Sequence, residues 1–338
     1  MREQLQKKFV EDWLNSSRRT ILKVAPRVGK CKISLEIAKR LGVRKMLVVF
    51  PRNDIQSSWE NEKIKWGYDI ELVFTTYKSL HKHTENYELR AYDELHEASE
   101  ANLIEIDKNK DQAIGLSGSM TKTTESKILE ATGMYVCSEY SIAQAVEDGI
   151  ICDYEINVHK LKLIPEDKRK FNSLHFRWEK AKGAYKRMLE LQIISFLQTC
   201  KTKELYTKEL IKKYADERIL VFCGQTDMAD RLGIPVYHSK NKEKQIFDDF
   251  CQGKGQHLAC CQLIQAGITI LPINRGIINY TSGSSENSAQ KICRFLGKEL
   301  YAPDKKAIID FLAIDEPFSM QRTKTALLFF DESKIIYK

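Results

Sequence analysis

Short apolar runs alternate with helical patterns along the first half of the chain. Thr20–Val24 is predicted to be a buried strand, and apolar residues recur at helical spacing from Ile33 to Leu41 behind it. Further strands are predicted at Met46–Phe50, Glu71–Thr76 and Gln112–Ser117. Strands that alternate with helices in this way are typical of a parallel α/β sheet.

The pattern changes after residue 155. Residues 165–218 are charged, poor in strand-forming runs and helical in period, and Arg187–Phe196 forms a dense stripe typical of a core or bridging helix. Strands are predicted again at Arg218–Phe222, Leu258–Cys261 and Gly276–Tyr280. We therefore expect two α/β domains, residues 1–155 and 156–338, with a helical segment at 165–218 opening the second.

Length and composition favour a globular protein of two ordinary domains. The chain has 338 residues, of which 43% are hydrophobic and 30% charged. It has no apolar run near the ~20 residues of a membrane span, and Met1–Gln6 has no apolar signal core. Its nine cysteines form no Cys-x-x-Cys pair, which is typical of reduced thiols. We expect a cytoplasmic protein without a membrane partner. The net charge of +8 is compatible with a nucleic-acid partner without establishing one.

The segment Ala25–Cys31 lies between the first predicted strand and its helix. A Gly29-Lys30 pair at such a turn places backbone N–H groups, a helix N-terminus and an ammonium group around one anion, as a nucleoside triphosphate requires. Arg27 stands where a first glycine is usual, and Cys31 stands where a hydroxyl would hold Mg²⁺. Taken alone, such a pair is more often a structural turn than a nucleotide site, so the rest of the chain has to supply the partners of nucleotide chemistry.

An acidic pair, Asp93-Glu94, follows some sixty residues later, with His96 two positions further on. At the end of a strand, one carboxylate can hold the water shell of Mg²⁺ while the other polarises the water that attacks a γ-phosphate. The alternative is an acidic surface turn, because the preceding Tyr87–Ala91 is less apolar than a central strand usually is.

Two further segments carry suitable chemistry. Gly115–Met120 leads from a predicted strand into Ser117 and Ser119, and Gln290 and Arg294 lie one helical turn apart on one helix face. An arginine that reaches a γ-phosphate from another domain stabilises the charge of phosphoryl transfer. The alternatives are a simple turn and a solvated helix face.

In their order and spacing, these segments resemble the superfamily 2 helicases and translocases, of the compact DExH kind found in phages. The resemblance runs from about residue 3 to about residue 300. Gln6 matches the adenine-reading glutamine, Gly29 and Lys30 match motif I, and Asp93–His96 matches motif II. Seven further segments of this chain resemble the remaining motifs of the family, in order along the chain: Phe50–Arg52 with Ile55–Trp59, Thr75–Leu80, Leu116–Ser119, Leu220–Cys223, Tyr237–Ser239, Gln265–Thr269 and Gln290–Arg294. This resemblance implies two tandem RecA-like lobes.

The resemblance also implies a role for each matched residue. ATP binding falls to Gln6, Arg27, Val28, Gly29, Lys30, Cys31, Gly267 and Thr269. Catalysis falls to Lys30, Asp93 (which holds Mg²⁺ through water), Glu94, Gln290 and Arg294. Coupling falls to His96, Ser117 and Ser119, and nucleic-acid binding to Arg52, Thr75, Thr76 and Ser239.

Four positions depart from the family pattern, at Arg27, Cys31, Cys293 and Gly297. The retained lysine, acidic pair, glutamine and arginine favour an active ATPase, whereas the missing loop hydroxyl favours a slow one. We expect an ATP-dependent helicase or translocase acting on DNA rather than RNA, in phage-type replication, recombination or repair, with other replication or recombination proteins as possible partners. The alternatives are a non-catalytic nucleic-acid-binding scaffold with a decayed motor site, and a small-molecule kinase, which would leave the second half unexplained.

Overall fold

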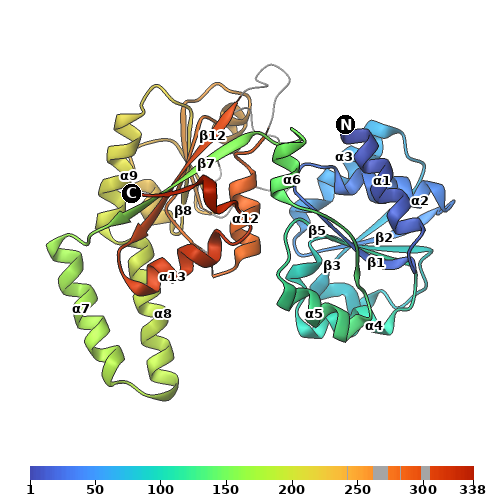
Figure 1. The fold of residues 1–338 in the computed structure, drawn as a ribbon, viewed down its shortest axis with the longest axis horizontal. Coiled ribbons are helices and arrows are strands. Elements are labelled where there is room, and N and C mark those ends of the chain that lie inside the picture. The colour runs from blue at the N-terminus through green and yellow to red at the C-terminus, as the bar shows by residue number, and fades with distance from the viewer. Residues whose placement is uncertain (242, 262–272, 282, 298–304) are drawn as a thin grey trace. The chain divides into compact units, whose positions relative to one another are not determined.

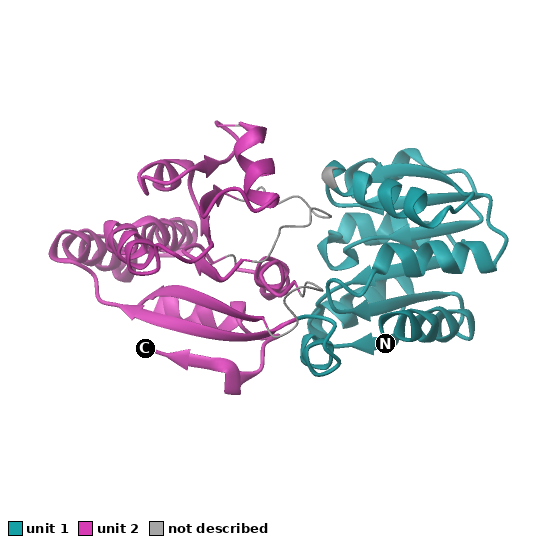
Figure 2. Ribbon diagram, turned by 90° about the horizontal axis from the view of Figure 1, so that it is seen from above, with its two compact units in different colours: residues 1–151, 265–268 teal, residues 152–264, 269–338 magenta. Residues whose placement is uncertain are grey.

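The computed structural model describes residues 1–241, 243–261, 273–281, 283–297 and 305–338. The chain divides into two compact units, Met1–Ile151 and the described residues from Cys152 onward, which Figure 2 distinguishes by colour. Among the described residues, each unit is built on one sheet whose strands all run parallel. The predicted α/β class with two parallel sheets is therefore confirmed.

The first unit has a six-stranded sheet within the described residues, in the order β3-β2-β4-β5-β1-β6. Its strands are β1 (Arg19–Val24), β2 (Lys45–Phe50), β3 (Glu71–Thr76), β4 (Leu89–Tyr92), β5 (Ala113–Ser117) and β6 (Val136–Tyr140). The central strands are buried along nearly their whole length. This explains why the sequence shows continuous apolar runs there instead of an alternation.

Helices cover both faces of this sheet (Figure 1). They are α1 (Arg2–Leu14), α2 (Lys30–Arg40), α3 (Gln56–Trp66), α4 (Glu100–Lys108), α5 (Lys122–Thr132) and α6 (Ile142–Glu147), with short 3-10 helices at Asn53–Ile55, Tyr77–Lys82 and Leu95–Glu97. Helices α1, α2 and α3 lie on one face and α4 and α5 on the other. Side chains such as Leu47, Tyr92 and Ile106 form the core on the α4–α5 side.

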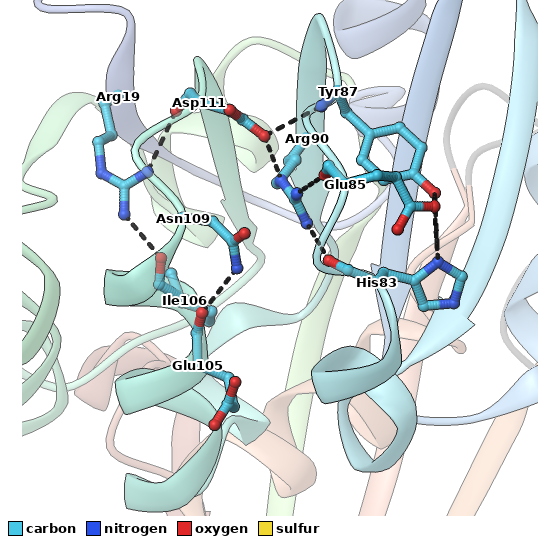
Figure 3. A network of polar contacts seen from close by, with 9 residues as sticks. All are labelled: Arg19, His83, Glu85, Tyr87, Arg90, Glu105, Ile106, Asn109 and Asp111. Carbon is cyan, nitrogen blue, oxygen red and sulfur yellow. Dashed lines mark hydrogen bonds and ion pairs between the residues drawn. The ribbon is translucent and has the colours of Figure 1, made fainter.

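Strand β4 is central although it contains a charged residue. Arg90 is fully buried, and its Nε donates to Asp111 Oδ2 over 2.7 Å while its other nitrogens donate to the carbonyl oxygens of His83 and Glu85. Figure 3 shows this network, in which the Tyr87 backbone N–H also donates to Asp111. Because every arm of the guanidinium has a partner, the buried charge is tolerated next to the acidic pair. Asp93, directly after this strand, is only 4% exposed, so the alternative of an acidic surface turn does not hold at that position.

The second unit has a seven-stranded sheet within the described residues, in the order β13-β7-β12-β11-β8-β10-β9. Its strands are β7 (Asp153–Leu161), β8 (Ile219–Cys223), β9 (Val236–Tyr237), β10 (His257–Cys261), β11 (Arg275–Ile278), β12 (Lys306–Ile314) and β13 (Ile335–Tyr337). The long pair β7 and β12, in register from Asp153↔Lys306 to Leu161↔Ile314, was not predicted from the sequence.

Seven helices of the described residues belong to the second unit. They are α7 (Pro165–Lys180), α8 (Gly183–Thr199), α9 (Lys201–Lys213), α10 (Thr226–Asp230), α11 (Lys244–Cys251), α12 (Ser285–Cys293) and α13 (Pro317–Ala326), with a 3-10 turn at Glu332–Lys334. Helices α7, α8 and α9 occupy the segment predicted to be helical. Phe171, Ile193 and Leu197 join α7 and α8 to the core of the unit. No helix among the described residues is long and apolar enough to cross a membrane.

Candidate functional site

The polar segments of the first unit gather at one edge of its sheet. Strands β4, β5 and β1 are neighbours, and Lys23 of β1 lies opposite Ser117 of β5. Because parallel strands end at the same edge, the turn before α2, the acidic pair after β4 and the serines ending β5 meet there. Ligands of open parallel sheets bind at this carboxyl edge.

Gly29 sets the geometry of the turn. It caps α2 with φ 100°, a left-handed conformation that favours glycine. Gln6 from α1 lies against it, and its Nε2 donates to the Val28 carbonyl oxygen over 2.7 Å in a buried bond. A Cβ atom on Gly29 would lie 2.5 Å from Gln6 Nε2. The position therefore requires glycine for both conformation and space, and Gln6 supports the backbone of the turn.

Two non-glycine residues of this edge share that strained backbone region. Arg27 has φ 69° and Glu94 has φ 48°. Each such residue costs on the order of 1–3 kcal/mol and occurs where the surrounding structure enforces it, most often at functional sites. Arg27 thus stands in a loop whose conformation suits glycine, as the sequence comparison of this position implied.

Lys30 and Glu94 form the centre of the cluster. Lys30 Nζ lies 3.1 Å from Glu94 Oε1, and both side chains are largely buried. Burial alone would lower the pKa of Lys30, but the charges of Glu94 and Asp93 outweigh it and raise that pKa. A Cβ atom on Gly118 would lie 3.1 Å from Lys30 Nζ and 3.2 Å from Pro26. Glycine there leaves the space in front of the ammonium group open.

Asp93 is held by three different elements. Its Oδ2 accepts from Trp59 Nε1 over 2.9 Å, its Oδ1 accepts from the Glu94 backbone N–H, and Tyr77 Oη donates to its carbonyl oxygen. Burial, together with the nearby Glu94 charge, raises the pKa of Asp93 to about 6. Burial also opposes ionisation of Glu94, but Lys30 and His96 hold the pKa of Glu94 below its usual range.

Trp59 was not predicted to belong to the site. It is fully buried in α3, and the sequence analysis named it only as the end of the motif segment Ile55–Trp59. Its indole N–H is the donor that fixes Asp93 Oδ2. An indole has a single donor and no acceptor, so a buried tryptophan usually points its N–H at a partner. That rule indicates that a partner exists without identifying which one.

The three residues predicted to couple the site form a chain. His96 Nδ1 lies 2.9 Å from Ser117 Oγ, which donates to the Ser119 carbonyl oxygen, and the same His96 nitrogen lies 3.6 Å from Glu94 Oε2. The side chain of His96 is buried, as is Ser117. The structure thus connects the end of β5 to the acidic pair through one histidine.

The donor set fits a divalent cation with a triphosphate. Two buried carboxylates lie together; burial first, and then the charge of Glu94, raises the pKa of Asp93 even though Lys30 opposes this repulsion. A cation beside Asp93 would relieve it. Cys31 fits less well: burial, and then the charge of Asp93, raises the pKa of its thiol well above the ordinary value. A neutral thiol is a poor ligand for Mg²⁺.

The remaining predicted residues lie elsewhere. Gln290 lies in α12, and Arg294 caps it; both are partly buried and belong to the second unit. Ser239, also in that unit, is exposed beyond β9. Gly267 and Thr269 fall outside the described residues.

Arg52, Thr75 and Thr76 lie at the carboxyl ends of β2 and β3 in the first unit. Arg52 is exposed and Thr76 partly buried, whereas Thr75 is only 7% exposed. Of the two threonines, Thr76 therefore has the side chain more available to a ligand in this structure.

Two parallel α/β units, with a glycine-lysine turn and an acidic pair at the carboxyl edge of the first, define a tandem RecA-like protein. Solved helicase structures share this fold. S. cerevisiae Dbp5 bound to RNA and ADP BeF3 matches with a TM-score of 0.61 and 10% identity, covering 98% of this chain and 88% of that one. The L327V form of Dbp5, with the same ligands, matches with a TM-score of 0.61 and 11% identity, covering 99% of this chain and 89% of that one. The Pyrococcus furiosus Hef helicase domain matches with a TM-score of 0.52 and 14% identity, covering 96% of this chain and 97% of that one.

The sequence matches no protein-family model and no curated protein. At identities this low, the structural likeness shows the fold alone. The activity therefore has to be argued from the site itself.

Proposed function

We propose that this protein is an ATP-dependent nucleic-acid motor, a helicase or translocase. The observation that carries the proposal is the buried cluster of Lys30, Glu94 and Asp93, which lies at the carboxyl edge of a RecA-like sheet directly after a glycine turn. A lysine at a helix N-terminus is suited to hold phosphate, and an acidic pair is suited to metal-assisted hydrolysis. The fold shared with helicase cores supports this proposal.

Each residue of the cluster in the first unit would have its own role in binding or hydrolysing ATP. Lys30 and the backbone N–H groups of the turn would bind the phosphates, and Gln6 would support the turn and contact the adenine. Asp93 would hold Mg²⁺ through water, oriented by Trp59. Mg²⁺ supplies charge neutralisation on the phosphate oxygens. Glu94, freed from Lys30 when that lysine turns to phosphate, would accept a proton from the attacking water, and His96 would transmit its position to Ser117.

Residues of the second unit complete the proposal. Gln290 and Arg294 lie on α12 and its cap, and we assign Arg294 the stabilisation of charge on the γ-phosphate. This assignment is carried by the sequence resemblance. It predicts that Arg294→Ala retains nucleotide binding and loses turnover.

The nucleic-acid partner and the choice of DNA over RNA rest on different arguments. A nucleic-acid partner is supported by the fold and by the Dbp5 structure, which is bound to RNA. DNA as the preferred polymer, with Arg52, Thr75, Thr76 and Ser239 as phosphate contacts, rests on the sequence resemblance. Contacts to phosphate do not depend on base sequence and weaken with salt.

One observation favours a second candidate, a nucleic-acid-binding scaffold with a decayed motor. The neutral thiol of Cys31 occupies the position of the metal-binding hydroxyl. This candidate predicts nucleic-acid binding that is indifferent to ATP and to Lys30→Ala.

Steady-state ATP hydrolysis separates the two candidates. Wild type, Lys30→Ala and Glu94→Gln are compared with Mg²⁺, with and without single-stranded DNA, duplex DNA or RNA. We expect wild type to hydrolyse ATP and both variants to lose turnover. Of the two variants, Glu94→Gln should still bind ATP and Lys30→Ala should not. Turnover that is absent from wild type under every condition would contradict it and favour the scaffold.

A further inference from the structure

Helices α7 and α8 pack against each other as a hairpin of the second unit, and the connection between them points away from the sheet (Figure 1). The base of the hairpin is anchored by Phe171, Ile193 and Leu197 in the core. We define the hairpin tip as residues 176–188, the end of α7, the connection and the start of α8. None of the functions assigned above uses these residues.

Positive charge is concentrated in the second unit and its hairpin. Residues 1–151 contain 23 Lys and Arg against 23 Asp and Glu, whereas residues 152–338 contain 31 against 23. The entire net charge of +8 therefore lies after residue 151. The hairpin tip alone contains five cations, Arg177, Lys180, Lys182, Lys186 and Arg187, and one carboxylate, Glu179.

The cations of the tip are not neutralised by carboxylates within the described part of the chain. Glu179 pairs with His175 over 3.5 Å. By contrast, Lys168 near the hairpin base pairs with Glu316 over 2.6 Å, and Lys201 beyond the hairpin pairs with Glu166. A set of uncompensated cations on one exposed element is costly by mutual repulsion, and a polyanion relieves that cost.

Aromatic rings are interleaved with these cations. Phe176 is 55% exposed and Tyr185 is 47% exposed. Lys180 Nζ lies 3.9 Å from the centre of the Phe176 ring, and Arg177 Nη2 donates to Tyr185 Oη over 2.8 Å. Exposed rings held beside phosphate-binding cations are what stacking of unpaired bases requires.

We propose that the hairpin tip is a nucleic-acid-binding site, in which its cations contact the phosphates of a strand and Phe176 and Tyr185 stack on unpaired bases. The inference rests on the proposed function for the identity of the polyanion. The hairpin tip would be a nucleic-acid contact surface outside the two sheets. None of the motif segments and neither sheet edge includes it. Charge complementarity favours this partner over a purely apolar one.

Binding of labelled oligo-dT, oligo-U and duplex DNA across a salt series tests the charges. The double variant Lys182→Glu/Arg187→Glu should lose about tenfold in affinity near 0.1 M salt and reduce the slope of log K against log salt by about two. The control Lys212→Glu/Lys324→Glu makes the same charge change at exposed positions on α9 and α13 and should retain wild-type affinity to within about threefold. Circular dichroism and thermal melting confirm folding of each variant.

The rings are tested separately. Phe176→Ala/Tyr185→Ala should weaken oligo-dT binding at least about fivefold and leave duplex binding near wild type. Leu191→Ala, at a position 61% exposed on α8, removes exposed apolar area without removing a ring and should change neither oligo-dT nor duplex binding.

The failures are distinguishable. Wild type that binds no nucleic acid overturns the proposed function and this inference together. Wild type that binds, with the tip charge variant equal to wild type in affinity and salt slope, overturns the inference alone. Anionic vesicles of phosphatidylserine and phosphatidylcholine form a further arm: loss of vesicle binding in the tip variant, with nucleic-acid binding unchanged, would overturn it in favour of a lipid surface.

Discussion

Cys31 is the residue of the candidate nucleotide site that fits Mg²⁺ binding least. Its thiol follows Lys30 at the start of α2, close enough to Asp93 for that charge to help raise the thiol pKa. A protonated sulfur offers Mg²⁺ little, whereas a hydroxyl at this position is an ordinary ligand. We therefore expect Cys31 to limit the rate of the proposed hydrolysis without affecting the fold.

Cys31→Thr should raise Mg²⁺-dependent ATP turnover by roughly tenfold, the effect of about 1.4 kcal/mol of added ligand energy. The measurement is steady-state ATP hydrolysis over a Mg²⁺ titration. Cys31→Ala removes the thiol without adding a hydroxyl and serves as the control. Equal turnover in the threonine and alanine variants would show that this position does not limit the metal site.

Trp59→Phe should raise the Mg²⁺ concentration needed for half-maximal turnover by about an order of magnitude, because Asp93 loses a charge-assisted hydrogen bond. Trp66→Phe is a close control: Trp66 lies on the same helix, and its indole N–H donates to the Glu62 carboxylate over 2.8 Å, but it is exposed. The same Mg²⁺ dependence in both variants would reduce Trp59 to a packing residue.

The sequence identified most residues of this edge and missed how they are held. Lys30, Asp93 and Glu94 were predictable because their types and order match a known motif series. The bond from Trp59 was not, because its partner is 34 positions away and only the sheet order brings α3 beside the end of β4. The roles of the residues stay predictions until the experiments above are done.

At the scale of elements, strand prediction succeeded where burial produces uninterrupted apolar runs. It missed strands, or left them open, where polar residues are buried with partners. Strand β4 contains Arg90, paired with Asp111, and β12 contains Asp310, which accepts from His159 and Arg275. Strand β7 contains His159 itself and alternates polar with apolar positions. In each strand the polar partner comes from a distant part of the chain, which pattern analysis does not see.

Helix α9 contains a buried lysine with a testable pH signature. Lys203 is 1% exposed and donates to the Asn279 carbonyl oxygen over 2.9 Å. Burial lowers the pKa of Lys203 from the usual 10.5 to about 8. Between these two values the unfolded chain keeps a proton that the folded chain has lost, so stability rises with pH across that window.

Lys203→Met should therefore be more stable than wild type near pH 7, and the difference should shrink by a few kcal/mol as the pH rises through 8 towards 10. Urea unfolding at a series of pH values measures it. The control is Lys201→Met, at the exposed start of the same helix. A difference from wild type that is as flat for Lys203→Met as for Lys201→Met would contradict the buried charge.

At the scale of the whole molecule, the two units differ in charge and in candidate chemistry. The first has a net charge of zero and carries the Gly29-Lys30 turn and the acidic pair, whereas the second carries the entire net charge of +8, the hairpin tip and Arg294. We propose that the first unit carries out most of the nucleotide chemistry, that the second contributes part of the polyanion binding, and that these two activities are coupled in one chain.

This coupling can be measured as ATP turnover against nucleic-acid concentration in wild type, Lys30→Ala and Arg294→Ala. We expect nucleic acid to stimulate wild-type turnover and both substitutions to abolish the stimulated rate, with ATP binding retained in Arg294→Ala. Wild-type turnover that is absent, or that is identical with and without DNA and RNA, would contradict it.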